Sequence, residues 1–162
     1  MQGTTDKVNE KDTTIGKDIY DKIEENPSML DLADIKALLL PNGDVEFTMK
    51  VEYRHTNVYG VVHGGIFATL LDTAMGFSCF YSGDDRRVMT INMNVSFVGN
   101  CPEGVIIKTT GRPIHSGKRT MVTEGEIFDE YGKLLATAQG TFFVLDKEDK
   151  RLVMPGSSST IN

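Results

Sequence analysis

Residues 61–76 read VVHGGIFATLLDTAMG, an apolar segment that begins near a glycine pair and carries one carboxylate, Asp72. Apolar side chains continue to about Tyr81 and point in nearly every direction at 3.6 residues per turn, which predicts a helix buried on most of its circumference. The small residues and the acid recur at spacings of three and four, at Gly65, Ala68, Asp72 and Gly76. We therefore expect a core helix on which another backbone, a ligand or a second subunit can approach Asp72 closely.

The start of this helix is a candidate electrophilic site. Behind His63, the pair Gly64-Gly65 leaves first-turn N–H groups unpaired and free of bulky side chains, which suits an anion or a developing oxyanion. Gly64 precedes Asp72 by eight residues, and eight residues of helix rise by about 12 Å. One helix cannot easily present both groups to one carbonyl. The spacing predicts a homodimeric site between two antiparallel copies of the helix.

Composition bounds the class of protein. The 162 residues are 40% hydrophobic and 25% charged, which suits one globular domain with a substantial core. A net charge of −6 argues against non-specific binding of nucleic acid, so an anionic ligand would need a local basic patch. No apolar run reaches membrane-spanning length or resembles a signal segment. The two cysteines suit reduced thiols, and we expect a cytoplasmic protein that is neither exported nor membrane-embedded.

The chain divides into one domain and two tails. Residues 1–14 are polar without periodicity, and 146–162 run from a charged stretch into a Gly-Ser-rich end, so both predict loose termini. Within the domain, 15–145, a short helix fits Ile15–Glu25 and a second one begins at Asn26-Pro27. We expect these helices to cover an edge or end of a sheet.

Period-two alternation predicts the strands. Apolar residues alternate with polar ones from Val45 to Tyr53, and the turn at 41–44 pairs this strand with Ile35–Leu40 as a hairpin. Alternation over Val88–Val98 places Met89, Ile91, Met93, Val95 and Phe97 on one face and Thr90, Asn92, Asn94 and Ser96 on the other. Three more strands fit an antiparallel meander, at Gly104–Pro113, Arg119–Phe128 and Lys133–Leu145. The pattern predicts an α+β fold in which five to six antiparallel strands wrap around one helix at about 64–81.

A further pattern links the helix to the loop before it. The chain has a loop asparagine, Asn57, then His63-Gly64-Gly65, then an acid nine residues after the histidine, Asp72. Over roughly residues 33–145, including the strand Thr90–Phe97, this order resembles the hotdog-fold acyl-CoA thioesterases of the phenylacetic-acid-degradation type. The resemblance implies thioester hydrolysis at a dimer boundary, with the helix acid as general base or nucleophile and a glycine amide of the facing subunit polarising the carbonyl. It also implies a homodimer or homotetramer with coenzyme A along the subunit boundary.

The catalytic candidates each have a structural alternative. Asp72 would activate water or attack the thioester, or else be a helix carboxylate bonded to a neighbour. Gly64 would donate its N–H to the thioester oxygen while Gly65 leaves room for the substrate, or the two would be packing glycines. His63 has a positioning role only.

Two polar residues outside the helix complete the candidate catalytic set. The amide of Asn57 could orient the attacking water or the carbonyl, or it could serve an ordinary turn. Thr90 matches the position where relatives place a hydroxyl near the acid, and a cross-strand hydroxyl is its alternative.

A basic turn is the candidate for the phosphates of coenzyme A. Two cations and several backbone N–H groups come together at Ser116, Gly117, Lys118 and Arg119, although solvated turn charge explains them nearly as well. Arg86 and Arg87 are a weaker second candidate. Coenzyme A would be part of the substrate, and we expect no separate cofactor.

Several other chemistries find no support. Cys79 has no cation at helical spacing to activate it, no serine elbow is present, and three scattered histidines predict no metal site. The leading hypothesis is an acyl-CoA thioesterase for aryl-acetyl or medium-chain acyl groups. The alternatives are a non-catalytic acyl-CoA-binding hotdog module or regulator, disfavoured because no basic DNA-reading segment precedes the domain, and a hotdog hydratase, which needs a histidine paired with an acid.

Overall fold

Six antiparallel strands and one long helix form the part of the chain that the computed structural model describes, residues 35–40, 44–82 and 86–146. The elements are β1 (Lys36–Leu39), β2 (Val45–Lys50), the short 3₁₀ helix η2 (Tyr53–His55), α2 (Gly64–Tyr81), β3 (Val88–Phe97), β4 (Ile106–Ser116), β5 (Thr120–Asp129) and β6 (Leu134–Val144). The two short helices expected at Ile15–Glu25 and after Asn26-Pro27 lie outside the described residues. In the described part, no helix is both long and apolar enough to span a membrane.

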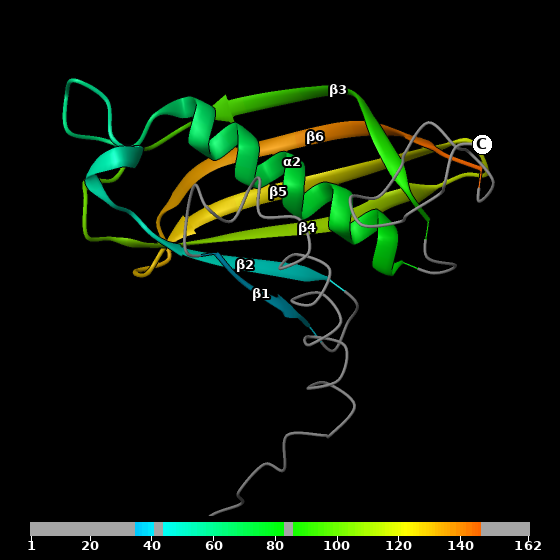
Figure 1. Cartoon of the computed structure of the whole chain (residues 1–162), viewed down its shortest axis with the longest axis horizontal. Coiled ribbons are helices and arrows are strands. Elements are labelled where there is room, and N and C mark those ends of the chain that lie inside the picture. Colours follow the sequence, from blue (N-terminus) through cyan, green and yellow to red (C-terminus); the bar gives the residue numbers. More distant parts are fainter. Residues whose placement is uncertain (1–34, 41–43, 83–85, 147–162) are drawn as a thin grey trace, which may run out of the picture.

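The strands form one sheet in the order β1-β2-β4-β5-β6-β3 (Figure 1). The β1–β2 hairpin and the β4-β5-β6 meander confirm the sequence prediction, as does the α+β class. After α2 the chain crosses to the far side of the meander, where β3 pairs with β6. β3 is therefore an edge strand of the described sheet.

Two strand ends differ from the prediction, the C-terminal end of β2 and the N-terminal end of β4, and each has a local cause. β2 buries Val45, Phe47 and Met49 as its alternation predicts, but it ends at Lys50, and the predicted extension to Tyr53 is wrong. The chain there turns into η2, which is capped by a hydrogen bond from the Glu52 N–H to His55 Nδ1 at 2.9 Å. β4 begins two residues later than predicted because Gly104 has a φ of 92° and belongs to a turn.

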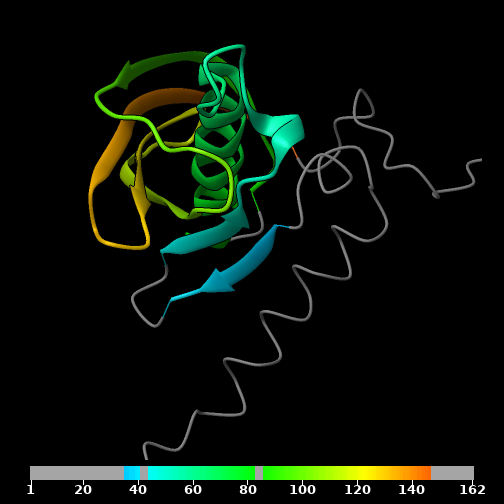
Figure 2. The same ribbon diagram turned by 90° about the vertical axis from the view of Figure 1, so that its left-hand side faces the viewer.

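The predicted helix agrees with α2, which lies on the concave face of the sheet while the strands curve round one side of it (Figure 2). One side of α2 is buried against the sheet, through Phe67, Leu70, Leu71, Ala74, Met75, Ser78 and Cys79. The prediction of burial on most of the circumference is confirmed, because Gly65 is the only exposed residue of α2. Ala68 and Asp72 are half-buried, and together with Gly65 they form the least covered part of the helix, which we call its open side.

Glycines in the sheet set the distance between helix and sheet. Gly111 on β4 pairs with Gly125 on β5. A Cβ on Gly111 would lie 2.3 Å from the carbonyl oxygen of Ala74, and one on Gly125 would lie 3.1 Å from both Leu71 and Met75 side chains. Because no side chain fits there, α2 packs directly against the strand backbone. The approach of a ligand or a second subunit to the small residues of the helix stays a prediction.

A β-bulge changes which residues of β3 face the helix. The register with β6 shifts between Thr90 and Asn92, so Ile91 is the extra residue. Val88 packs against the core from one side of the bulge, and Met93 and Val95 do so from the other, while Thr90 hydrogen-bonds to α2. The prediction that Thr90 and Met93 lie on opposite faces of the strand is therefore wrong, because one inserted residue reverses which face each later side chain takes.

Candidate active site

The entry into α2 is fixed by backbone hydrogen bonds. The N–H of His63 donates to the carbonyl of His55 at 2.9 Å, and the N–H of Val62 donates to the carbonyl of Cys101 at 3.0 Å. His63 is the N-cap residue, but its exposed side chain makes no capping hydrogen bond. The start of the helix is therefore held by its backbone, and the histidine side chain stays available at the surface.

The glycine pair presents two open amide donors. The carbonyl of His63 accepts from Ile66 and Phe67, at 2.9 and 3.4 Å, while the N–H groups of Gly64 and Gly65 donate to nothing within the described residues. A Cβ on Gly65 would meet no atom within 4 Å, whereas one on Gly64 would lie 3.3 Å from the ring of Phe97. Such unpaired N–H groups at a helix start can polarise a carbonyl or hold an oxyanion.

Asp72 is oriented by a residue of β3. The hydroxyl of Thr90 donates to Asp72 Oδ1 at 2.8 Å, and the second carboxylate oxygen has no hydrogen-bond partner in the described part of the chain. The bulge at Ile91 is what turns Thr90 toward the helix. A half-buried carboxylate with one oxygen held and one free can act as a base toward water or as a nucleophile.

Asn57 builds the loop before the helix. Its Oδ1 accepts a hydrogen bond from the N–H of Tyr59 at 2.9 Å, and its carbonyl accepts from Gly60 at 2.9 Å. Gly60 has a φ of 73°, which glycine adopts without strain. The amide oxygen is therefore engaged in an Asx turn, and only the amide NH₂ group is left to contact a substrate.

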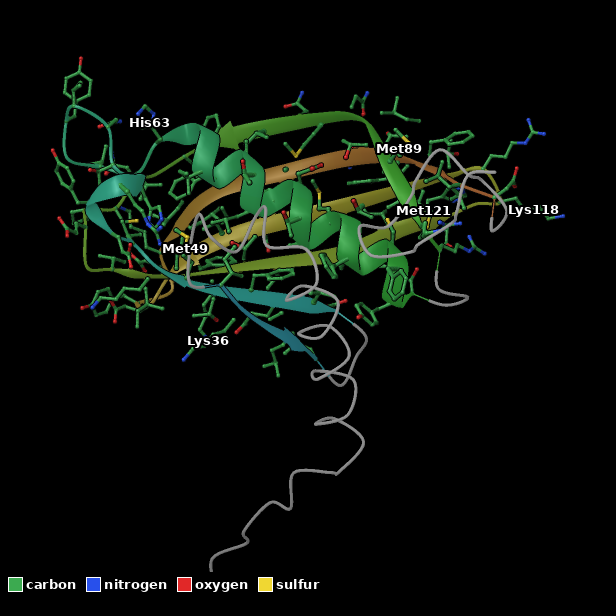
Figure 3. All side chains as sticks on the ribbon, viewed as in Figure 1. Lys36, Met49, His63, Met89, Lys118 and Met121 are labelled. Carbon is green, nitrogen blue, oxygen red and sulfur yellow. The ribbon has the colours of Figure 1, made fainter. Side chains whose placement is uncertain are left out.

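The basic turn lies far from the helix start. Figure 3 places His63 at one end of the molecule and Lys118 at the other. Gly117 donates its N–H to the carbonyl of Thr120 at 3.0 Å, so this amide is not available to a phosphate, contrary to the sequence prediction. The side chains of Lys118 and Arg119 are exposed, and Arg86 contacts the turn through Gly117 and Ser116.

The structure thus brings the predicted residues together in three groups. Asp72 and Thr90 are bonded; His63, Gly64 and Gly65 share the helix start with the Asn57 loop; and Ser116 to Arg119 form the distant turn. Gly64 and Asp72 lie about 12 Å apart along their helix. The contact of Phe97 with Gly64 does not follow from the sequence, because strand alternation predicts a face but not the neighbour that a ring meets.

Neither cysteine has the environment of a nucleophile. Burial raises the pKa of Cys79 to about 12, and burial together with the nearby charge of Asp129 raises the pKa of Cys101 to about 11. Both thiols stay protonated near neutral pH, and a protonated thiol is a poor nucleophile. The described residues contain no cluster of three or more histidine, cysteine or acidic side chains that could hold a metal ion.

Several known proteins are similar to this chain in sequence. The thioesterase superfamily matches residues 59–136. Human acyl-coenzyme A thioesterase 13 is 30% identical over 100 residues, 61% of this chain and 71% of the relative. The 1,4-dihydroxy-2-naphthoyl-CoA hydrolase of Escherichia coli is 28% identical over 121 residues, 73% of this chain and 87% of the relative.

A solved structure supports the same conclusion at the level of the fold. The E. coli PaaI protein from the phenylacetic acid degradation operon superposes with a TM-score of 0.73 over 83% of this chain and 96% of its own length, at 22% identity. The resemblance first drawn from Asn57, the His63-Gly64-Gly65 turn and Asp72 is confirmed. The chain belongs to the thioesterase superfamily, has the hotdog fold and is a thioester hydrolase.

Proposed function

We propose that the protein hydrolyses acyl-CoA thioesters in a site formed by two copies of the chain, with Asp72 of one copy facing the Gly64 amide of the other. The observation that carries the proposal is the pairing of an oriented carboxylate with open amide donors that one helix holds about 12 Å apart. An attacking group and an oxyanion donor must both lie about 3 Å from one reacting centre. A second, antiparallel copy of α2 would satisfy that requirement.

The proposed reaction balances around Asp72. The free carboxylate oxygen takes a proton from water, and the water oxygen bonds to the thioester carbon while the Gly64 N–H stabilises the oxyanion. The intermediate then collapses, the C–S bond breaks, and the proton on Asp72 passes to the leaving sulfur, which yields the free acid and coenzyme A. In a second route Asp72 attacks the carbon itself, the C–S bond breaks and coenzyme A leaves as a thiolate. Water then hydrolyses the resulting anhydride, which regenerates the Asp72 carboxylate, releases the acid and supplies the proton for the thiolate. Thr90 holds the carboxylate in either route, and the Asn57 NH₂ group orients the carbonyl or water.

The surface along β3 supports association. Met89, Ile91, Phe97 and Val98 are each at least half exposed, and β3 pairs only with β6 in the described sheet. An exposed apolar edge strand is a ready site for pairing with another chain. The open side of α2 runs beside this edge, since Gly64 lies against Phe97 and Asp72 is bonded to Thr90. We infer a homodimer through this surface, which can double into a homotetramer.

The relatives and the basic turn support a proposal for the substrate class. The human and E. coli relatives are named for acyl-CoA and naphthoyl-CoA, and Lys118 and Arg119 supply exposed cations for the phosphates of coenzyme A. We propose aryl-acetyl or medium-chain acyl groups as the acids released. His63 and Gly65 border the carbonyl end of the site.

Release of coenzyme A thiol from phenylacetyl-CoA and a medium-chain acyl-CoA panel tests the proposal. Asp72→Asn keeps the shape of the side chain but removes its basicity, so we expect kcat to fall by about 10²–10⁴-fold, the usual worth of a general base. The oligomeric state, measured by light scattering, should stay the same. Wild-type protein that hydrolyses no thioester would overturn the proposal, and an Asp72→Asn variant with full activity would remove Asp72 from it.

Mixed dimers test whether the site is shared. Gly64→Pro removes the amide donor, and proline suits the first helical position because His63 already has the extended backbone that a following proline requires, with φ −62° and ψ 134°. A dimer of one Asp72→Asn chain and one Gly64→Pro chain would hold one intact site if the two groups come from different copies. If both groups came from one chain, every mixed dimer would be inactive.

A further inference from the structure

A single side chain ties the β4–β5 turn to the segment that follows α2. Arg86 Nη1 donates to the carbonyl oxygen of Gly117 at 2.7 Å and to the Ser116 hydroxyl at 3.3 Å. These partners lie 31 and 30 residues further along the chain. A guanidinium holds its donors in a rigid plane, so two contacts to one turn fix its position more strongly than one flexible ammonium could.

The turn itself has little freedom left. Gly117 uses its N–H for the Thr120 carbonyl at 3.0 Å and its carbonyl for Arg86, so both polar backbone atoms of this residue are engaged. A Cβ on Gly117 would lie 2.8 Å from the Thr120 oxygen, which explains the glycine. The side chains of Lys118 and Arg119, in contrast, make no hydrogen bond or ion pair to any described residue. Two unengaged cations thus stand on a turn of fixed shape.

The neighbouring arginine does something different. Arg87 Nη2 approaches the carbonyl of Asp146 at 3.5 Å, and the carbonyl of Arg87 accepts from Leu145 at 2.9 Å. These two bonds tie Arg87 to the residues that directly follow β6. Arg86 and Arg87 carry the same charge one residue apart. Comparing the loss of each therefore separates the effect of a positive charge from the effect of the Arg86 contacts to Ser116 and Gly117.

We infer that Arg86 is a positioning residue for recognition of the substrate phosphates. It holds the turn at 116–119 in the shape that presents Lys118 and Arg119 to the anionic end of coenzyme A, and it acts through the turn rather than on the reacting carbonyl. This inference rests on the proposed function, in which that turn receives the phosphates. It assigns a role in KM to a residue distant from Asp72 and Gly64.

Two substrates with the same acyl group test it: the coenzyme A thioester, and the N-acetylcysteamine thioester, which lacks phosphates. Arg86→Ala should raise KM for the coenzyme A thioester about tenfold, the worth of hydrogen bonds to a charged group, and leave kcat/KM for the short thioester within about twofold. Arg87→Ala, the matched control, should leave the ratio of the two efficiencies near its wild-type value. Arg86→Lys should recover part of the lost affinity, because it keeps a donor for Gly117.

Hydrogen exchange supplies a readout independent of turnover. The Gly117 amide should exchange faster in Arg86→Ala than in wild type, and at the wild-type rate in Arg87→Ala. Equal loss on both thioesters, an unchanged KM, or unchanged exchange in Arg86→Ala would each overturn the inference. If the wild type hydrolyses neither thioester, the proposed function fails and the inference fails with it. If the wild type hydrolyses both, and Arg86→Ala leaves the ratio of the two kcat/KM values unchanged, the inference alone fails.

Discussion

The two sides of α2 use small residues for opposite purposes. On the sheet side, bulky residues of the helix such as Leu71 and Met75 pack onto strands whose glycines, Gly111 and Gly125, leave no space for a side chain. On the open side, the helix itself carries the small residues, and the strand beside it supplies Thr90 and Phe97. Close packing on one side fixes the helix, which lets the other side keep unpaired polar groups.

The difference separates stability from activity. A group on the sheet side has a packing partner in every direction, so its replacement should cost folding free energy. The amides of Gly64 and Gly65 and the free oxygen of Asp72 have no partner within the described chain, so changes there should cost turnover and spare the fold. Substitutions on the two sides of α2 should therefore have different consequences.

Removing one amide donor on the open side should have the largest effect. Gly64→Pro deletes the N–H, and we expect kcat to fall about 10²–10³-fold, as for loss of an oxyanion donor. Gly64→Ala is the matched control, because it adds a Cβ at the same position, 3.3 Å from the ring of Phe97, but keeps the N–H. The measurement is thiol release with a melting curve for each variant. Full activity of Gly64→Pro would show that this amide is not the donor.

Adding a side chain between α2 and the sheet should destabilise the protein and leave the catalytic groups unchanged. Gly111→Ala places a Cβ 2.3 Å from the Ala74 carbonyl oxygen, and we expect a loss of unfolding free energy of about 3 kcal/mol, since backbone must shift to relieve it. Gly65→Ala is the control for stability, because its Cβ would meet no atom within 4 Å, whereas the φ of 83° at Gly132 is strained for alanine. Denaturant unfolding measures the effect. A stability equal to wild type would contradict the close packing.

Removing the hydrogen bond that orients Asp72 should have a smaller effect on kcat. Thr90→Val keeps the volume of the side chain but removes the donor to Asp72 Oδ1. We expect kcat to fall about tenfold, in line with loss of one hydrogen bond to a charged group, with little change in melting temperature. Thr90→Ser, which keeps the hydroxyl, should retain most of the activity. If valine and serine behave alike, the hydrogen bond does not contribute to turnover.

The smallest expected effect concerns the buried thiol of Cys79 on the sheet side of α2. Burial raises the pKa of Cys79 from 9.0 to about 12 in the folded chain. The folded state therefore binds the proton more tightly than the unfolded state, so this stabilisation is complete below pH 9 and is lost as pH rises toward 12. Unfolding free energies at pH 8 and above pH 10 should show the decline, and Cys79→Ala should lessen it. Rapid labelling of native Cys79 at pH 8 would contradict this burial.

Much of the candidate site follows from local pattern. Helical periodicity predicts the bounds Gly64–Tyr81, which the structure confirms, and the spacing of Gly64 from Asp72 predicts a site shared between two copies. Alternation located β2 and the meander. It also located β3, but the bulge at Ile91 inserts one residue that no local signal marks. Alternation therefore puts Thr90 on the wrong face, although the resemblance associates Thr90 with the acid.

The sequence by itself determined the order and approximate positions of the strands, the helix, the glycine pair at its start and the acid within it, since these depend on periodicity and on backbone chemistry that neighbours in the chain decide. Only the tertiary structure decided which side of α2 is open, that Thr90 bonds to Asp72, and that Arg86 holds a turn 31 residues away. Those contacts join segments distant in the chain, and they depend on strand register and on the glycines that bring helix and sheet together.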